Sequence, residues 1–246
     1  MNVVMLGASK GIGRAVARLL AERGDRLCLL GRDVDDLRRS AADLGVRAGT
    51  DGAGVAVATC DLTDPDTFGP ALDAAATALG RVDTVIVTAA DFATQADLEA
   101  DRDRLRRLLT VNFANTVLFC EDARKKLLGA GGTLCVVSSV AGERGRKPVI
   151  LYGATKAGLS RYLEGLDHKF RSQGLKVVCV KPGFVKTGMT AGLKPPPFAG
   201  DAPDVARDIV KAIDRGTPVI YTPRMWALVM FVIRLLPRAV MRRIGF

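Results

Sequence analysis

The sequence predicts an α/β fold in which helices cover both faces of one doubly wound, parallel sheet. Short apolar runs alternate along the chain with longer segments whose apolar residues recur at helical spacing. The short runs are continuously apolar, which is typical of strands buried on both faces. With 246 residues, 48% of them hydrophobic, and no repeat or linker, the chain is expected to form one large domain.

The predicted elements follow one another as strand, helix, strand from the amino terminus. Residues 2–6 form the first strand, and the helix after it runs to Gly24, a suitable C-terminal cap. Asp33 can cap the second helix, and Asp64 with the proline after it can begin the third. The charged segment 96–128 predicts one or two helices. The remaining strands are expected at 26–31, 55–59, 82–88, 133–138, 175–181 and 218–221, and the remaining helices at 33–44, 64–80, 150–173 and 202–215.

Residues 224–246 differ in composition from the rest of the chain. They contain five arginines and no acidic residue, which is half of the net charge of +10. Residues 225–233 are apolar on every side, and Pro237 should break or restart a helix. We therefore predict an α/β domain, 1–222, and an apolar and basic helical extension, 223–246. The apolar run is too short to span a bilayer, which needs about 20 residues. The extension either lies in a membrane interface, anchored by arginine, or packs on the substrate cleft or a second subunit.

Composition and motifs exclude several functions. The five cysteines lie in apolar segments without a CxxC pair, so we expect a reducing compartment and neither a zinc site nor a disulfide framework. The only histidine, His168, has no partner motif, so no metal site is predicted. Aromatic residues are few and no recognition motif for nucleic acid is present. The first residues are expected to form a buried strand, which leaves no room for a signal peptide. A cytoplasmic protein is expected, at the inner face of the membrane if the extension binds there.

The turn between the first strand and the first helix predicts a nucleotide site. Gly7, Gly11 and Gly13 permit a tight turn and a close backbone approach, and the helix N-terminus attracts phosphate. The second strand is followed by Arg32, where an enzyme that uses NAD usually has an acidic residue. Arg32 and Lys10 would together bind the 2′-phosphate of NADP. NADP is therefore favoured and NAD is the alternative. A third possibility is that both cations are solvated surface charges without a role in binding.

Tyr152 and Lys156 lie one turn apart on a predicted helix, and Ser139 ends the strand before it. A free tyrosine has a pKa of about 10, and an ammonium about 4 Å away contributes about 4 kcal/mol to the tyrosinate at an effective dielectric near 20. Lys156 is thus expected to lower the pKa of Tyr152. Ser139 would stabilise negative charge on a substrate carbonyl, and Tyr152 would donate the proton. The alternative is a packed tyrosine on a core helix.

These motifs resemble the short-chain dehydrogenase/reductase family. The resemblance covers nearly the whole chain and is carried by Gly7-Ala-Ser-Lys-Gly11-Ile-Gly13 and by Tyr152-x-x-x-Lys156. It implies a Rossmann-type sheet with strand order 3-2-1-4-5-6-7, NAD or NADP as cofactor, and a homodimer or homotetramer that pairs through two central helices.

The resemblance also implies roles for individual residues. Asn112 would complete a catalytic tetrad with Ser139, Tyr152 and Lys156, and would hold a water that relays protons. Two departures from the family, Leu6 for threonine and residues 87–90 for Asn-Asn-Ala-Gly, affect the cofactor ribose pocket. The expected cofactor contacts are Gly7, Ser9, Lys10, Gly11, Ile12, Gly13, Arg32, Asp61, Leu62, Ala89, Tyr152, Lys156, Pro182, Gly183, Val185 and Thr187.

The substrate is indicated by two segments beside these motifs. Arg144, Arg146 and Lys147 lie in the loop between the two catalytic elements, and they form either a binding patch for an anionic group or a solvated loop. Residues 186–200 are long and rich in glycine and proline, as expected of a lid over the substrate.

Three functions follow from this sequence. The first is NAD(P)H-dependent reduction of a ketone with Tyr152 as proton donor, on a lipid-linked keto sugar. Sequence around the catalytic residues and in the arginine-containing tail resembles reductases of that substrate class. The second is reduction of a 3-oxoacyl or other lipophilic ketone. The third is an NADP-binding regulatory protein without catalysis.

Overall fold

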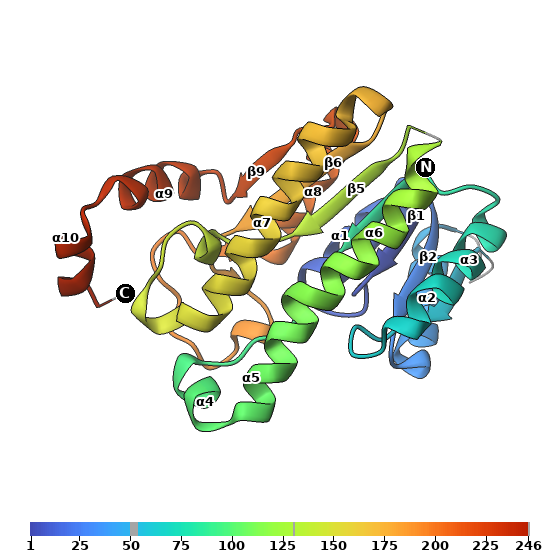
Figure 1. The fold of residues 1–246 in the computed structure, drawn as a ribbon. Helices are drawn as coiled ribbons and strands as arrows, with labels where there is room; N and C mark the ends of the chain where they lie inside the picture. The colour runs from blue at the N-terminus through green and yellow to red at the C-terminus, as the bar shows by residue number, and fades with distance from the viewer. Residues whose placement is uncertain (50–53, 130, 246) are drawn as a thin grey trace.

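The computed structural model describes residues 1–49, 54–129 and 131–245. Among them, seven strands form one parallel sheet in the order β3-β2-β1-β4-β5-β6-β9 (Figure 1). The predicted doubly wound sheet and its strand order are confirmed, with β9 as the seventh strand. The strands are β1 (Asn2–Leu6), β2 (Arg26–Gly31), β3 (Val55–Thr59), β4 (Thr84–Val87), β5 (Thr133–Val137), β6 (Lys176–Pro182) and β9 (Val219–Thr222).

Helices cover both faces of the sheet, and each face has its own hydrophobic core. Successive side chains of a strand point to opposite faces. In β1, Val3 and Met5 therefore join one core, and Val4 and Leu6 join the other. This is why the strands have no polar alternation. The first core is covered by α1 (Gly11–Glu22), α2 (Val34–Arg47) and α8 (Ala202–Arg215), and the second by α3 (Phe68–Leu79), α6 (Asn115–Leu128) and α7 (Ile150–Phe170).

Cap residues explain why the charged segment contains more helices than predicted. Residues 95–128, all of which the structure describes, form α4 (Gln95–Ala100), α5 (Arg102–Leu109) and α6, where one or two helices were expected. The Asp101 side chain accepts hydrogen bonds from the backbone N–H groups of Asp103 and Arg104, so it begins α5 directly after α4. A π-helical turn at Thr110–Ala114 joins α5 to α6.

The predicted lid contains short regular elements. β7 (Val185–Lys186) pairs with β8 (Gly200–Asp201), outside the main sheet. The Thr190 hydroxyl donates to the backbone oxygens of Val185 at 2.7 Å and Thr187 at 3.2 Å, which closes the turn between them.

Two helices follow the sheet and stand apart from it in Figure 1. They are α9 (Met225–Leu235) and α10 (Arg238–Arg243). Pro237 lies between them, as expected from its missing N–H group. Residue 246, the last of the predicted extension, lies outside the described residues, and the proposed boundary at 222/223 stays a prediction. No helix in the described part of the chain has the length and apolarity to cross a membrane.

Candidate active site

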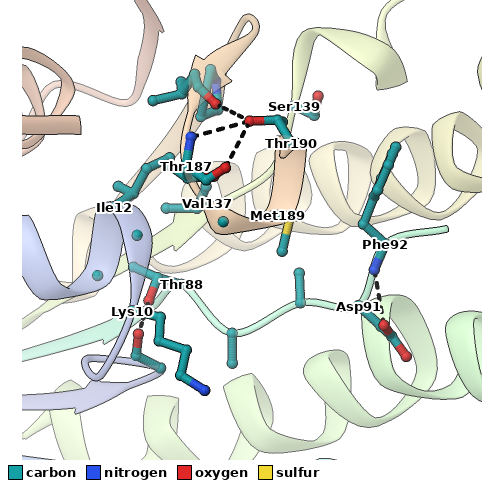
Figure 2. A pocket seen from close by; sticks show the side chains of 18 of the residues that line it. Lys10, Ile12, Thr88, Asp91, Phe92, Val137, Ser139, Thr187, Met189 and Thr190 are labelled. Atoms are coloured by element: carbon teal, nitrogen blue, oxygen red, sulfur yellow. Dashed lines mark hydrogen bonds between the residues drawn. The ribbon is translucent and has the colours of Figure 1, made fainter. Parts of the chain in front are cut away.

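A cleft of about 890 Å³ lies at the carboxyl ends of the central strands. It begins at the glycine turn after β1, passes the ends of β4 and β5, and reaches the lid (Figure 2). Every residue that the sequence indicated for cofactor contact lines this cleft. In Figure 2, Lys10 and Thr88 lie at one side, Asp91 and Phe92 at the other, and Met189 between them.

At Gly7 and Gly13 the glycine turn packs too closely for a side chain. Gly7 has a φ of +99°, and a Cβ on it would lie 2.5 Å from the backbone nitrogen of Ala89. A Cβ on Gly13 would lie 2.1 Å from the Gly7 oxygen. The Thr88 hydroxyl donates to the same oxygen at 2.9 Å, so the unusual 87–90 segment ties β4 to the turn.

The start of α1 suits the diphosphate of a dinucleotide. Lys10, the N-cap residue, makes no side-chain hydrogen bond to the helix, and the first turn contains no acidic residue. The first N–H groups of the helix therefore have no side-chain cap and face the cleft with the positive end of the helix dipole. Together with the space above the three glycines, this fits NAD or NADP.

The adenosine end of the cleft carries charges of both signs. Arg32 and Lys10 line it, and so do Asp33, which the sequence indicated only as a helix cap, and Asp36, which the sequence did not indicate. Lys10 Nζ lies 3.9 Å from a carboxylate oxygen of Asp36. The Asp33 carboxylate accepts a hydrogen bond from the Asp36 N–H as the cap of α2, and this bond lowers the pKa of Asp33. In the sequence, Asp33 directly follows Arg32 and Asp36 lies three residues further on, and this proximity was the available signal.

The two serines at the end of β5 point to different environments. Ser138 is buried and bonds to the Lys156 backbone oxygen at 3.0 Å and to the Ser160 hydroxyl at 2.7 Å, so it fastens the strand to α7. Ser139 lines the cleft, accepts from the Ala141 N–H at 3.0 Å and hydrogen-bonds with Tyr152. Both serines line the cleft, but the Ser138 hydroxyl is engaged in these two bonds, so Ser139 is the one placed to meet a substrate.

Tyr152 and Lys156 lie on the same face of α7 and both line the cleft. Lys156 Nζ donates to the Val137 oxygen at 3.0 Å and lies 5.8 Å from the centre of the Tyr152 ring. Burial raises the pKa of Tyr152 to about 12, although its hydrogen bond with Ser139 opposes the rise. Burial lowers the pKa of Lys156 to about 8.

The expected lowering of the Tyr152 pKa by Lys156 is therefore not found. Lys156 is buried and Tyr152 is partly buried, and desolvation disfavours the charged form of each. At neutral pH the tyrosine is protonated and the lysine largely charged, which are the forms that reduction of a carbonyl requires.

Asn112 lies behind the cleft instead of in its lining. It is 1% exposed, and its side chain accepts from the Asp91 N–H and donates to the Asp91 oxygen, both at 2.7 Å. It therefore fixes the chain after β4 from within the π-helical turn, a feature that is frequent near functional sites. Its role in holding a water stays a prediction.

Asn112 positions residues that the sequence did not indicate. Asp91 and Phe92 line the cleft, and the Phe92 ring meets the Tyr152 ring edge-on at 5.2 Å between centres. Arg107 also lines it, and its Nε lies 3.1 Å from an Asp91 carboxylate oxygen. No local motif marks these residues, because the π-helical turn with Asn112 and the segment with Asp91 meet only in the folded chain.

The three basic residues in the loop between Ser139 and Tyr152 have different surroundings: one lines the cleft, and two bind the C-terminal helices. Arg146 lines the cleft, and its Nε is buried without a hydrogen-bond partner among the described residues. Arg144 and Lys147 do not line the cleft. Arg144 donates to the Leu236 oxygen at 2.6 Å and Lys147 to the Arg242 oxygen at 2.7 Å. These oxygens end α9 and α10, where helices leave carbonyls unpaired and attract cations.

Comparison with known sequences agrees with this geometry. The family described as short chain dehydrogenase matches residues 1–197. An uncharacterized oxidoreductase of Mycobacterium tuberculosis is 34% identical over 98% of this chain and 96% of its own. An uncharacterized oxidoreductase of Streptomyces coelicolor is 33% identical over 99% and 95%. The 3-oxoacyl-[acyl-carrier-protein] reductase of Bos taurus is 31% identical over 84% and 88%.

Solved structures share the fold. A short-chain dehydrogenase/reductase from Mycobacterium ulcerans superposes with a TM-score of 0.80 at 22% identity, covering 89% of this chain and 87% of the other. A variant of actinorhodin polyketide ketoreductase with NADPH gives 0.79 at 21% identity, covering 90% and 95%. The chain belongs to the short-chain dehydrogenase/reductase family. It is an NAD(P)-dependent oxidoreductase.

Proposed function

We propose that this protein reduces a ketone to an alcohol with NADPH and with Tyr152 as the proton donor. The observation that carries the proposal is that Ser139, Tyr152 and Lys156 line one cleft with the glycine turn. A regulatory nucleotide-binding protein would not need this set of proton-donating side chains. The role of each follows from its environment.

The side chains divide the work of carbonyl reduction. The nicotinamide cofactor supplies the hydride when it is bound. The Ser139 hydroxyl donates a hydrogen bond to the carbonyl oxygen and stabilises its developing charge. Tyr152, which burial keeps protonated, donates its proton to that oxygen. Lys156, whose Nζ donates to the Val137 oxygen beside the cleft, holds the nicotinamide ribose.

We favour NADPH over NADH because Arg32 and Lys10 stand at the adenosine end. Arg32→Ala should raise the KM for NADPH at least tenfold, since a hydrogen bond to a charged group contributes about 1.5–3 kcal/mol. The KM for NADH should change little, because it has no 2′-phosphate. Initial rates at varied cofactor concentration measure both values. An equal rise for both cofactors contradicts phosphate recognition by Arg32.

We further propose that the substrate carries an anionic group, bound by Arg146. The support is its buried, unpartnered Nε within a cleft that also contains Tyr152. The surrounding sequence resembles decaprenylphosphoryl-2-keto-erythro-pentose reductase, so a keto sugar on a polyprenyl phosphate is our first candidate. A 3-oxoacyl thioester is the second, because of the similarity to the Bos taurus reductase of that name.

NADPH oxidation by the purified protein tests the substrate class. The assay compares phosphate-bearing, carrier-linked and neutral ketones with wild type and Arg146→Gln. The variant should raise the KM about tenfold for the anionic ketones only. Arg81→Gln is the matched control, because Arg81 is exposed and lies outside the cleft lining. An equal rise in the KM for neutral ketones would contradict an anion site at Arg146.

By resemblance to the family, we propose a homodimer or homotetramer that pairs through α6 and α7. These helices lie side by side on one face of the sheet (Figure 1). Phe113 and Leu118 are exposed apolar residues at this surface, as an interface requires.

A further inference from the structure

Helix α9 is apolar on two opposite faces, and only one of them is covered. Trp226, Met230 and Ile233 are buried on a cluster that includes Val140, directly after Ser139. The other face is open to solvent. Its exposed side chains are Met225, Leu228, Phe231, Val232 and Leu235, of which Leu228, Phe231 and Leu235 are 60%, 62% and 69% exposed.

The covered face holds α9 firmly at the rim of the cleft. Trp226 lines the cleft and donates from Nε1 to the Phe198 oxygen in the lid at 3.1 Å. It packs so closely that a Cβ on Gly183 would lie 2.1 Å from Nε1. Arg144 binds the end of the helix at Leu236. Packing on the substrate cleft, which was one expectation for residues 223–246, therefore accounts for the inner face of α9. It leaves the outer face unexplained.

Positive charge surrounds the uncovered face. Arg224, Arg238, Arg242 and Arg243 are exposed, and none forms an ion pair within the described part of the chain. Residues 224–246 contain no acidic side chain to complement them. In a twofold dimer this surface would meet itself and oppose arginine to arginine. An apolar helix face bordered by unpaired arginines is instead the composition of a helix that lies in the headgroup region of an anionic bilayer.

We propose that the outer face of α9, with the arginines of α10, binds peripherally to an anionic lipid bilayer and holds the mouth of the cleft against it. Met189 and Leu193 both line the cleft and are exposed. They add apolar surface to the cleft, which Trp226 of α9 also lines. An amphiphilic ketone thus reaches Tyr152 while its apolar chain stays in the bilayer. This last consequence rests on the proposed reductase function; the membrane contact does not.

Vesicle sedimentation without substrate or cofactor tests the membrane contact. The full-length protein should sediment with vesicles of phosphatidylglycerol and phosphatidylcholine, and not with phosphatidylcholine alone. Phe231→Ser combined with Leu235→Ser should weaken the partition coefficient at least tenfold, because two large apolar side chains are lost from the interface. Val46→Ser is the matched control, since Val46 is 73% exposed on α2.

Two readings complete the test. Trp226 is the only tryptophan, so an unchanged emission spectrum shows that α9 remains docked in the double variant. Failure of the wild type to sediment with anionic vesicles overturns the proposal. So does a change in the oligomeric state of the lipid-free double variant, which would make the face a contact between copies. The same preparations are also assayed for reduction of water-soluble ketones. This activity tests the reductase proposal independently of membrane binding.

Discussion

Tyr152→Phe is expected to lower kcat for ketone reduction by about 10³-fold, because general acid catalysis contributes about 10²–10⁴-fold. The substitution removes the only atom of the side chain that can donate a proton and keeps the ring. The ring packs edge-on against Phe92, so the cleft should keep its shape. The dissociation constant for NADPH, measured by fluorescence, should therefore change little. Stopped-flow absorbance at 340 nm follows the chemical step.

Tyr162→Phe is the matched control for this experiment. Tyr162 lies on the same helix but donates to a carboxylate oxygen of Glu121, away from the cleft. Its loss should affect stability and leave kcat within about twofold of wild type. Normal turnover by Tyr152→Phe, or an equal loss in both variants, would rule out Tyr152 as the proton donor.

The fold was predictable because its signals are local. The uninterrupted apolar run of β1 reflects burial on both faces, which Val3 and Val4 illustrate by entering different cores. The order of the strands is different, since periodicity does not say which strands are neighbours. That order came from the resemblance to a family. The helix boundaries in 95–128 depended on Asp101, whose capping role is visible only once its hydrogen bonds are known.

The site shows the same division between local and distant contacts. Tyr152 and Lys156 share a helix face by spacing alone, and the structure keeps them together. Arg144 and Lys147 were assigned to the substrate with Arg146, but their partners are 92 and 95 residues away in the chain. A cation that binds an anion and one that binds the end of a helix look alike in sequence. The partner of Asn112 is likewise 21 residues distant.

Glu143→Ala is expected to have the largest effect on stability, lowering the free energy of unfolding by about 3 kcal/mol. The Glu143 side chain is 8% exposed, and its Oε1 lies 2.7 Å from Lys181 Nζ. Its other oxygen accepts from the Tyr221 hydroxyl at 2.9 Å and lies 3.5 Å from Arg234 of α9. The substitution leaves the Lys181 ammonium, only 13% exposed, without a counter-charge. Urea denaturation followed by circular dichroism measures the loss.

The pH dependence separates the ion pair from simple packing. Burial alone would raise the pKa of Glu143, but the hydrogen bonds and charge of Lys181 and the Tyr221 bond lower it. The stability that ionised Glu143 contributes is therefore complete above its pKa in the unfolded chain, about 4.3. It is lost as the pH falls through the lower pKa of the folded protein. Burial alone would lower the pKa of Lys181, and Glu143 raises it. The stability that charged Lys181 contributes is complete below its pKa in the unfolded chain, about 10.4. It is lost as the pH rises through the higher pKa of the folded protein.

The difference in unfolding free energy between wild type and Glu143→Ala should thus be constant from about pH 5 up to the pH at which the unpaired Lys181 of the variant, whose pKa burial lowers, loses its proton, and it should shrink outside this window. Glu164→Ala is the control, because its partner Arg161 is exposed and such pairs contribute at most about 1 kcal/mol. A loss independent of pH would mean that Glu143 acts by filling space. A loss that follows the window means that charge joins the catalytic loop to β6, and through Arg234 to the helix that we propose faces the membrane.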